Sequence, residues 1–350
     1  MTSSIPEFVE RVRQASGRKQ PLRIRGGGTK DFYGARLEGA VLETRGYAGM
    51  VEYEPTELIA TARAGTSLRD LEAALAANNQ MLAFEPPHFG PDSTFGGCIA
   101  SGFSGPRRAY AGSARDFVLG VRMLNSEGED LRFGGQVMKN VAGYDLSRLM
   151  TGSFGTLGLL LEISVKVLPR PEIEQTLLFR MSEAQAIETV NRWAGQPFPF
   201  SATCFLDGIL HVRLSGSSPG VEAAKRRLGG EPLADGPAFW RSLRDQSHPF
   251  FRREMPLWRL SVKSSSPPLE FGPTLIEWGG AVRWVSANID PDRANEAAVR
   301  CSGHATLFRA LEKPDGIQRL SPEVLALHKK LKKALDPNGI FGPGRLHPEF

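Results

Sequence analysis

Three glycine-rich segments in the first half of the sequence constrain the fold more than any other feature. They span residues 25–29, 91–116 and 152–158. Glycine has no Cβ, so the backbone can approach a ligand closely, and successive N–H groups in such a turn form a concave site for an anion. Each segment alone is compatible with a tight surface turn. Their joint occurrence, in this order, favours a site for a flat cofactor that carries phosphates.

The first segment, Arg25-Gly-Gly-Gly-Thr29, follows a predicted strand over residues 21–25. It lacks the GxGxxG spacing of a dinucleotide-binding fold, and no Gly-Lys-Ser/Thr follows it as in a P-loop. A run of backbone N–H groups at this position suits a pyrophosphate, although by itself the signal is weak.

The second segment contains Pro91-Asp-Ser-Thr-Phe-Gly-Gly-Cys-Ile-Ala-Ser-Gly102, then Ser104-Gly105 and Tyr110 to Asp116. We expect residues 85–113 to form a long loop that wraps a cofactor, because connections of this length tend to be functional or disordered. The third segment joins Lys139-Asn-Val-Ala-Gly-Tyr-Asp-Leu146 to Gly152-Ser-Phe-Gly-Thr-Leu-Gly158.

Hydrophobic periodicity and capping residues predict the regular elements. Helices are expected at 5–16, 68–77, 182–194, 219–228, 238–246 and after Ser321. Strands are expected at 21–25, 40–44, 50–54, 58–64, 117–124, 130–133, 158–168, 176–180, 202–206, 209–214 and 257–263, followed by strand, helix and strand within 281–310. The order after Pro169-Arg-Pro171 suggests a βαββαβ-like layer, and no internal repeat is evident. In the last helix, Leu327, Leu331 and Leu335 predict an apolar stripe.

Composition limits the possible classes of function. The net charge of +5 suits an anionic cofactor or an acidic partner, and ordinary solvated charge explains it equally well. Cys98, Cys204 and Cys301 are far apart, which argues against a disulfide framework and against an iron–sulfur site within this protein. The first residues lack the apolar core of a signal peptide, and no run of about 18 apolar residues occurs. We therefore expect a cytoplasmic protein, located at the inner face of the membrane if it belongs to a complex.

Residues 1–171 resemble the FAD-binding domain of the vanillyl-alcohol oxidase family, also called the PCMH-type domain. The motifs that match are RGGGT at 25–29, TxGGxxASG at 94–102, Tyr110-x-Gly112, Arg115-Asp116 and GSFGTLG at 152–158. The segment Leu335-Asp-Pro-Asn-Gly-Ile-Phe-Gly-Pro-Gly-Arg345 resembles the C-terminal motif of the same family.

The resemblance implies an α+β fold with a two-part FAD-binding domain at 1–171 and a smaller α/β cap or subunit-contact domain at 172–310. A C-terminal helix and tail at 311–350 would return to the FAD domain. Many relatives attach FAD through a His at the position of Thr29, so the resemblance implies FAD held without a covalent bond. The implied FAD-binding residues are Arg25, Gly26, Gly27, Gly28, Thr29, Lys30, Pro91, Thr94, Gly96, Gly97, Ser101, Gly102, Gly105, Gly155 and Gly158.

Within the family, the NxxGYDLxxLxxGSxGTLG region at 140–158 looks like the D-2-hydroxyacid branch. The short length and the FGPGRLHP tail at 341–348 look most like the smaller FAD-binding subunits of bacterial glycolate oxidases. The resemblance implies a subunit of a glycolate (2-hydroxyacid) oxidase or dehydrogenase, with a larger FAD-binding subunit and an iron–sulfur subunit as partners. Electrons from the hydroxyacid would pass through flavin to the iron–sulfur partner. Two alternatives remain open: a free-standing FAD oxidase of another substrate, and a non-catalytic scaffold subunit.

No catalytic residue can be assigned from the sequence. Single-polypeptide D-2-hydroxyacid dehydrogenases of this branch carry an HxGDGNxH-like stretch and a metal-binding His pair in their second domain. The second half of this sequence has neither feature, so no metal site is expected. Of the six His, His88 is the least improbable base. Arg252, Arg253 or Arg259 could bind a carboxylate, although scattered surface charge explains them more simply. We therefore expect the isolated protein to oxidise glycolate or D-lactate poorly, and partners to dock on an apolar face of residues 172–310.

Overall fold

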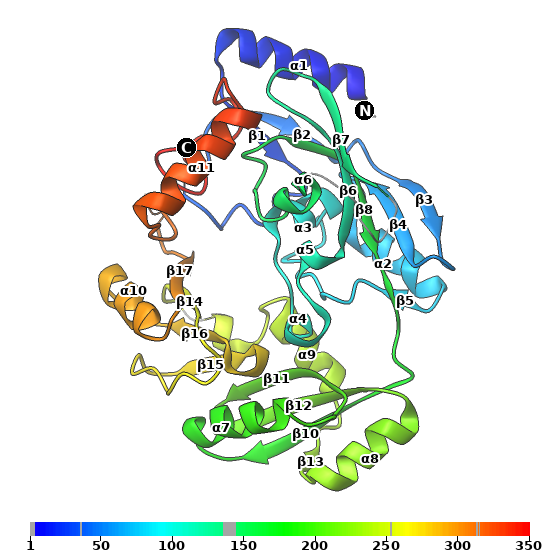
Figure 1. Ribbon diagram of the computed structural model, residues 1–350, viewed down its shortest axis with the longest axis vertical. Coiled ribbons are helices and arrows are strands. Elements are labelled where there is room, and N and C mark those ends of the chain that lie inside the picture. The colour runs from blue at the N-terminus through cyan, green and yellow to red at the C-terminus, as the bar shows by residue number, and fades with distance from the viewer. Residues whose placement is uncertain (1–3, 36, 136–144, 253, 313, 315) are drawn as a thin grey trace.

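The computed structural model describes residues 4–35, 37–135, 145–252, 254–312, 314 and 316–350. Two sheets lie at opposite ends of the molecule, and the C-terminal helix lies beside the N-terminal part (Figure 1). The expected α+β class is confirmed. Among the described residues, no helix is both long and apolar enough to cross a membrane.

The N-terminal part contains six helices and nine strands among the described residues. Its helices are α1 (Ile5–Arg18), α2 (Leu68–Ala77), α3 (Phe95–Ser101), α4 (Arg108–Ala111), α5 (Ala114–Phe117) and α6 (Leu146–Leu149). Its strands are β1 (Leu22–Arg25), β2 (Ala40–Glu43), β3 (Met50–Glu54), β4 (Ile59–Arg63), β5 (Gln80–Met81), β6 (Val118–Leu124), β7 (Asp130–Gly134), β8 (Leu159–Lys166) and β9 (Leu168–Pro169).

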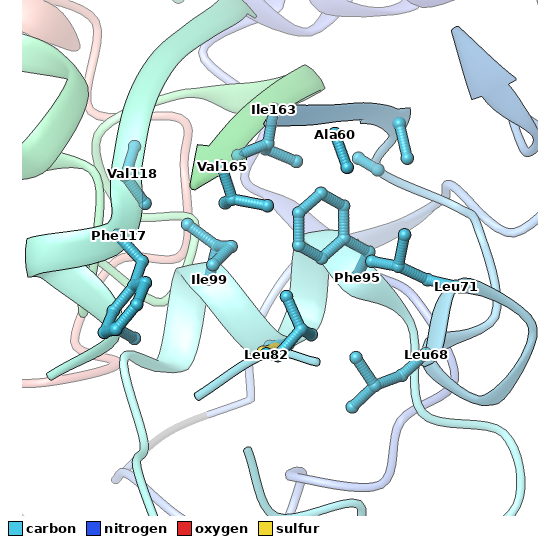
Figure 2. Close-up of a cluster of buried hydrophobic side chains, with 14 of the residues drawn as sticks. Ala60, Leu68, Leu71, Leu82, Phe95, Ile99, Phe117, Val118, Ile163 and Val165 are labelled. Atoms are coloured by element: carbon cyan, nitrogen blue, oxygen red, sulfur yellow. The ribbon is translucent and has the colours of Figure 1, made fainter. Parts of the chain in front are cut away.

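Five of these strands form an antiparallel sheet in the order β3-β4-β8-β6-β7. Helices α2 and α3 cover one face of it, and Figure 2 shows Phe95 and Ile99 of α3 packed beside Ile163 and Val165 of β8. The opposite face is polar: Thr61 and Ser164 are hydrogen bonded at 2.8 Å. One apolar face and one polar face are typical of an antiparallel sheet at a protein surface.

The expectation of a continuous loop over residues 85–113 is wrong, because α3 and α4 lie within it. Thr94 caps α3, accepting a hydrogen bond of 3.2 Å from the Gly97 N–H, and Gly102 ends the helix in the left-handed conformation. Helix propensity does not predict α3, because it contains two adjacent glycines and each glycine lowers helix stability by about 1 kcal/mol relative to alanine. Tertiary packing of Phe95 and Ile99 supplies the compensating stability.

The C-terminal part forms one eight-stranded sheet. Its helices are α7 (Glu183–Ala194), α8 (Ser218–Leu228), α9 (Gly236–Arg244) and α10 (Pro291–Arg300), with short 3₁₀ turns η1 (Pro249–Arg252) and η2 (Trp278–Gly280). Its strands are β10 (Ile173–Arg180), β11 (Phe200–Leu206), β12 (Ile209–Gly216), β13 (Glu231–Pro232), β14 (Leu257–Ser261), β15 (Thr274–Glu277), β16 (Val282–Ser286) and β17 (His304–Arg309).

The strand order β13-β10-β12-β11-β15-β16-β14-β17 reads as two similar halves joined by β11 and β15. In the first half, the order of elements β10-α7-β11-β12-α8-β13 confirms the predicted βαββαβ pattern. The second half repeats the strand order in reverse, without a helix between β14 and β15. This relationship is invisible in the sequence, and β15 was not predicted.

The two faces of this sheet have different coverings. Helices α7 and α8 cover one face of the first half, and α10 covers the same face of the second half. The other face carries α9 and a cluster of aromatic side chains that includes Tyr33 and Phe308. Because side chains alternate along a strand, Leu257, Arg259, Leu275 and Glu277 belong to this second face.

Helix α11 (Pro322–Leu335) is present as predicted, but its expected apolar stripe is wrong. Leu327 is 56% exposed, whereas Lys332 is only 7% exposed. The Lys332 ammonium donates hydrogen bonds to Asp336 Oδ2 at 2.7 Å and to the carbonyl oxygens of Thr156 and Phe341 at 2.8 and 2.6 Å. The helix is thus fixed to the N-terminal part by a buried charge. Beyond it, Phe341 forms a parallel bridge with Leu22 at the edge of β1.

Candidate functional site

A cleft in the N-terminal part brings most of the predicted cofactor residues together. We call it the glycine cleft; its empty volume is about 730 Å³ with open solvent included. Its predicted members are Arg25, Gly26, Gly27, Gly28, Thr29, Lys30, Thr94, Gly97, Ser101 and Gly155. Nine further residues line the glycine cleft, and the sequence did not predict them: Arg23, Ile24, Asp31, Leu37, Glu38, Ala100, Phe154, Gly342 and Arg345.

The turn after β1 presents a row of backbone donors to this cleft. Gly28 has a φ of +69°, and its carbonyl accepts a hydrogen bond of 3.0 Å from the Asp31 N–H. Within the described part of the protein, the N–H groups of residues 26–30 have no protein acceptor. Unpaired consecutive amides of this kind form an anion-binding concavity, and glycine accommodates the left-handed backbone that shapes it.

Close packing between two glycine-rich segments fixes the shape of the cleft. A Cβ built on Gly27 would lie 1.5 Å from the carbonyl oxygen of Asp92. The contact with residues 91–94 therefore already requires a glycine at position 27, whether or not a ligand is bound. A methyl group at this position would push the two walls of the cleft apart.

Two buried cations stand at the wall of the glycine cleft. The Lys30 ammonium donates to Ser93 Oγ at 3.1 Å, and burial lowers the pKa of Lys30. Arg345 donates through Nη2 to the Lys30 carbonyl at 3.1 Å, while its buried Nη1 has no partner among the described residues. Burial lowers the pKa of Arg345 to about 10. A buried guanidinium nitrogen without a partner is costly, and an anionic ligand would satisfy it.

The remaining predicted residues lie elsewhere. Gly102 and Gly105 line a second cleft described below. Pro91, Gly96 and Gly158 line neither cleft. Gly96 packs against Ala64 and Gly158 against Met123, so both allow close packing within the protein. Of the third glycine-rich segment, residues 139–144 fall outside the described residues, together with most of the Asn140–Leu146 motif.

The second cleft, which we call the aromatic cleft, lies between residues 101–106 and the open face of the eight-stranded sheet. Its empty volume is about 830 Å³ with open solvent included. Ser101 lines both clefts, and Tyr33 of the aromatic cleft stacks on Phe154 of the glycine cleft with 4.9 Å between ring centroids. The lining is Tyr33, Pro87, Phe89, Ser101, Gly102, Phe103, Ser104, Gly105, Pro106, Leu243, Arg244, Gln246, Arg259, Glu277, Trp278, Trp284, Thr306 and Phe308.

Strand register places the polar residues of the aromatic cleft side by side. Arg259 on β14 pairs with Trp284 on β16 and with Thr306 on β17. Glu277 ends β15, and its Oε2 accepts a hydrogen bond of 2.8 Å from Trp284 Nε1. Burial raises the pKa of Glu277 to about 7, against the opposing effects of this hydrogen bond and of Arg259. Perturbed acids in a cleft are common at functional sites.

His88, the candidate base, lines neither cleft. Its Nε2 lies 2.9 Å from Glu72 Oε2, so it has a structural partner. Arg252 is exposed and outside both clefts, and Arg253 falls outside the described residues. Of the two arginines that the structure describes, Arg259 lines a cleft and Arg252 does not. Across the described residues, no group of three or more His, Cys, Asp or Glu side chains could hold a metal ion.

Comparison with known proteins assigns the protein to a family. Residues 2–134 match the model of the FAD binding domain family. The glycolate oxidase subunit GlcE of Escherichia coli is 47% identical over 344 residues, which cover 98% of this chain and 97% of that protein. The chain belongs to the GlcE family. It is a PCMH-type flavoprotein and an FAD-dependent oxidoreductase, as the motifs in its first half predicted.

Two further relatives of this GlcE family member match about half of its length. The glycolate oxidase subunit GlcD of Bacillus subtilis is 35% identical over 165 residues, 47% of this chain and 35% of that protein. A D-lactate dehydrogenase of Archaeoglobus fulgidus is 34% identical over 171 residues, 48% of this chain and 38% of that protein.

Solved structures extend the likeness in fold to nearly the whole length. p-Cresol methylhydroxylase with substrate bound superposes with a TM-score of 0.71 at 14% identity, over 99% of this chain and 88% of that chain. An alkyldihydroxyacetonephosphate synthase superposes with a TM-score of 0.66 at 16% identity, over 97% of this chain and 74% of that chain. At such low identity the likeness concerns the fold alone.

The glycine cleft fits FAD, the cofactor of this family. Unpaired amides at residues 26–30 and the partnerless Arg345 Nη1 suit an anionic group such as a pyrophosphate. The stacked Phe154 and Tyr33 provide apolar surface where the two clefts meet. Neither cleft contains a histidine or a cysteine among the described residues, so no such side chain is in place to form a covalent bond to the flavin.

Proposed function

We propose that this protein is the FAD-binding GlcE subunit of a multi-subunit glycolate (2-hydroxyacid) oxidase or dehydrogenase. Its partners would be a larger FAD-binding subunit and an iron–sulfur subunit, and electrons would pass through its flavin to the iron–sulfur partner. The observation that carries the proposal is the 47% identity to GlcE across 98% of the chain. The complex would act in the cytoplasm, at the inner face of the membrane.

We further propose how the polypeptide is divided. Residues 1–171 and the returning tail 311–350 would form the FAD-binding unit, and 172–310 would form the cap or subunit-contact unit. The bridge between Phe341 and Leu22, and the contact of Arg345 with Lys30, support the return of the tail. The fifteen implied FAD residues remain part of the proposal, and those that line the glycine cleft are its best-supported members.

FAD supplies the two-electron redox chemistry when it is bound. The protein's part is to hold it: amides at residues 26–30 and the Arg345 guanidinium would bind its phosphates. The three cysteines are scattered, and Cys98 and Cys204 are buried, which supports placing the proposed iron–sulfur centre on a partner subunit.

Co-expression with candidate partner subunits tests the proposal. We expect the tagged protein to co-purify with two further polypeptides, FAD and iron. With glycolate as donor, the assembly should reduce a quinone analogue, whereas the FAD-loaded subunit alone should do so at least tenfold more slowly. Equal rates for the subunit and the assembly would favour the free-standing oxidase. A subunit purified without any flavin would favour the scaffold role.

The expected docking face on residues 172–310 gains little support from the structure. In the described part of that range, Met255 and Val299 are the exposed large hydrophobic residues, at 42% and 59% exposure. Other exposed residues of this type lie outside that range: Leu311, Val324 and Leu327 in or before α11, and Val41, Met50, Val51 and Tyr110 in the N-terminal part. Exposed apolar side chains therefore do not single out residues 172–310 as a docking face.

A further inference from the structure

The aromatic cleft contains a cation, Arg259, that no described carboxylate contacts at ion-pair distance. Arg259 projects from the middle of β14 into the cleft, and within the described residues its guanidinium forms neither an ion pair nor a hydrogen bond. Its neighbours are two indole rings: the guanidinium carbon lies 5.0 Å from the Trp278 ring centroid and 6.0 Å from that of Trp284. An enclosed charge flanked by aromatic faces costs free energy unless an anion joins it, so the site is suited to a carboxylate.

A proton acceptor lies on the same face of the sheet. The register places Leu275 opposite Trp284, and Glu277 lies two residues further along β15. Trp284 therefore contacts both charged residues: it pairs with Arg259 in the ladder and donates its indole N–H to Glu277 Oε2. The second carboxylate oxygen, Oε1, has no hydrogen-bond partner in the described part of the protein.

Contacts from neighbouring segments hold the Trp278 ring in place beside Arg259. Trp278 has a φ of +56°, an unusual conformation for a bulky residue, and its indole N–H donates to the Gly105 carbonyl at 3.1 Å. Arg108 covers the same ring, with 4.5 Å between the guanidinium carbon and the ring centroid. Strained backbone of this kind persists where surrounding contacts enforce it, and such positions cluster at ligand sites.

We propose that the aromatic cleft binds a small 2-hydroxycarboxylate, that Arg259 holds its carboxylate, and that Glu277 accepts the proton of its 2-hydroxyl group. This inference rests on the proposed function, because the adjoining glycine cleft must hold FAD as the electron acceptor. It assigns substrate binding to the GlcE-type subunit itself rather than to a sister subunit.

The proposed step balances. The O–H bond of the 2-hydroxyl breaks and its proton goes to the Glu277 carboxylate, while the electron pair forms the C=O bond. The C2–H bond breaks with its pair, and this hydride reduces FAD by two electrons. The products are a 2-oxoacid, reduced flavin and protonated Glu277, which then loses its proton to solvent.

The protonation state of Glu277 supports this role. Burial raises the pKa of this carboxyl to about 7, and a base is most effective when its pKa is close to the working pH. Several groups from neighbouring elements act on it or share its cleft: Arg259 on β14, Arg213 on β12, Arg244 on α9, Glu85 and Tyr33. A bound carboxylate on Arg259 would remove part of that cation's influence and raise the pKa of Glu277 further.

Calorimetric titration of the FAD-loaded protein with glycolate tests the binding site. We expect glycolate to bind, and glycolamide, the neutral amide of the same shape, to bind at least tenfold more weakly. Arg259→Ala should raise the Kd for glycolate at least tenfold, and Arg259→Lys should give an intermediate value because lysine cannot bind a carboxylate in bidentate fashion. Arg300→Ala, which removes an exposed arginine from α10, should leave the Kd unchanged.

Anaerobic mixing with glycolate, followed by flavin absorbance, tests Glu277. Glu277→Gln should bind glycolate at pH 8 no more weakly than the wild type. It should nevertheless reduce the flavin at least 100-fold more slowly, as expected for loss of a general base. The wild-type rate should rise with pH through the titration of Glu277, and the variant rate should not.

The outcomes separate the two proposals. Wild-type protein with full FAD that does not bind glycolate would overturn the inference and leave the FAD assignment intact. Arg259→Ala with wild-type affinity, or Glu277→Gln with a wild-type rate of flavin reduction, would overturn it as well. Protein without FAD would contradict the proposed function, whereas glycolate titration would still test Arg259. If Arg259→Ala does not fold, Arg259→Lys and glycolamide provide the decisive comparison.

Discussion

Glu85 and Arg213 form an ion pair of 2.8 Å although 128 residues separate them in the sequence. Glu85 follows β5 in the N-terminal part, and Arg213 lies in β12 of the eight-stranded sheet. Arg107 also binds Glu85, through its backbone N–H at 2.9 Å and its guanidinium at 3.3 Å. This buried cluster fixes the two parts of the molecule to each other beside the aromatic cleft.

Replacing Glu85 should destabilise the protein strongly. Burial alone would raise the pKa of Glu85, but Arg213 and Arg107 hold it below its usual value. Because the folded-state pKa is lowered, the stabilisation is present above about pH 4.5 and is lost as the pH falls through the folded-state pKa. Glu85→Ala removes a carboxylate that two buried guanidiniums share and leaves Glu174 as their remaining anion, so it should cost about 3–5 kcal/mol in urea denaturation at pH 7.

The matched control is Glu57→Ala, which removes an exposed carboxylate from the turn between β3 and β4. It should change the free energy of unfolding by less than about 0.5 kcal/mol. A Glu85→Ala protein as stable as this control would mean that the ion-pair cluster does not join the two parts.

Lys332 provides a second test of buried charge. Lys332→Ala leaves Asp336, which is 2% exposed, without its cation and should lower the free energy of unfolding by about 3–5 kcal/mol. Lys333→Ala, one residue further along α11 and exposed, should have little effect. Chemical denaturation of both variants measures the difference. Equal midpoints would show that Lys332 is not a structural anchor.

FAD should be released completely when the protein is precipitated with acid. Thr29 stands where many relatives carry the attachment His, and neither cleft contains a histidine or cysteine among the described residues. The measurement is flavin absorbance in the supernatant and in the washed pellet. Flavin that stays with the denatured protein would contradict the assignment of a non-covalent cofactor.

Gly27→Ala should lower the FAD content of the purified protein at least tenfold. The new methyl group would start 1.5 Å from the Asp92 carbonyl oxygen, so the turn at residues 26–30 must move away from residues 91–94. Gly17→Ala is the control, since a Cβ there meets no atom within 4 Å. The ratio of flavin to protein absorbance compares the two variants, and equal ratios would show that this turn does not form the site.

Glu277 should make stability depend on pH in the opposite direction to Glu85. Burial raises its pKa to about 7, so the folded state binds a proton that the unfolded state has already lost. Stability therefore falls as the pH rises from about 4.5 to 7 and is constant above that range. Glu277→Gln should be about 3 kcal/mol more stable than the wild type at pH 8, and nearly equal to it at pH 4.5. Chemical denaturation at both pH values measures the difference in free energy of unfolding between the variant and the wild type. The same difference at both pH values would refute the raised pKa of Glu277.

The sequence predicted the elements whose signals are local. The span predicted for α2, 68–77, matches the structure, since Ser67 accepts a hydrogen bond from the Asp70 N–H and the leucines mark one face. The predicted strands around Asp207-Gly208 form the hairpin of β11 and β12. The glycine cleft was also largely predictable, because glycine-rich turns after strands are characteristic of anion sites.

The features that the sequence did not predict depend on contacts between residues far apart in the chain. In the sequence, only Asp336 at i+4 distinguishes Lys332 from the three other lysines of α11. The burial of Lys332 depends on the carbonyl groups of Thr156 and Phe341, which no local pattern predicts. Glu277 belongs to a short strand whose neighbours lie on β11 and β16. One signal was accessible: in Leu257-Trp-Arg-Leu-Ser, alternation places Arg259 on the same face as Leu257, an unusual position for an arginine without a function.

The glycine cleft also constrains the order of events during synthesis. One wall comes from residues 23–31, and the other includes Gly342 and Arg345, which are synthesised more than 300 residues later. At about 5–20 residues per second, the early turn must wait on the order of half a minute for its opposite wall. The complete cleft is therefore available to flavin only after Arg345 has been synthesised and has folded back onto residues 23–31.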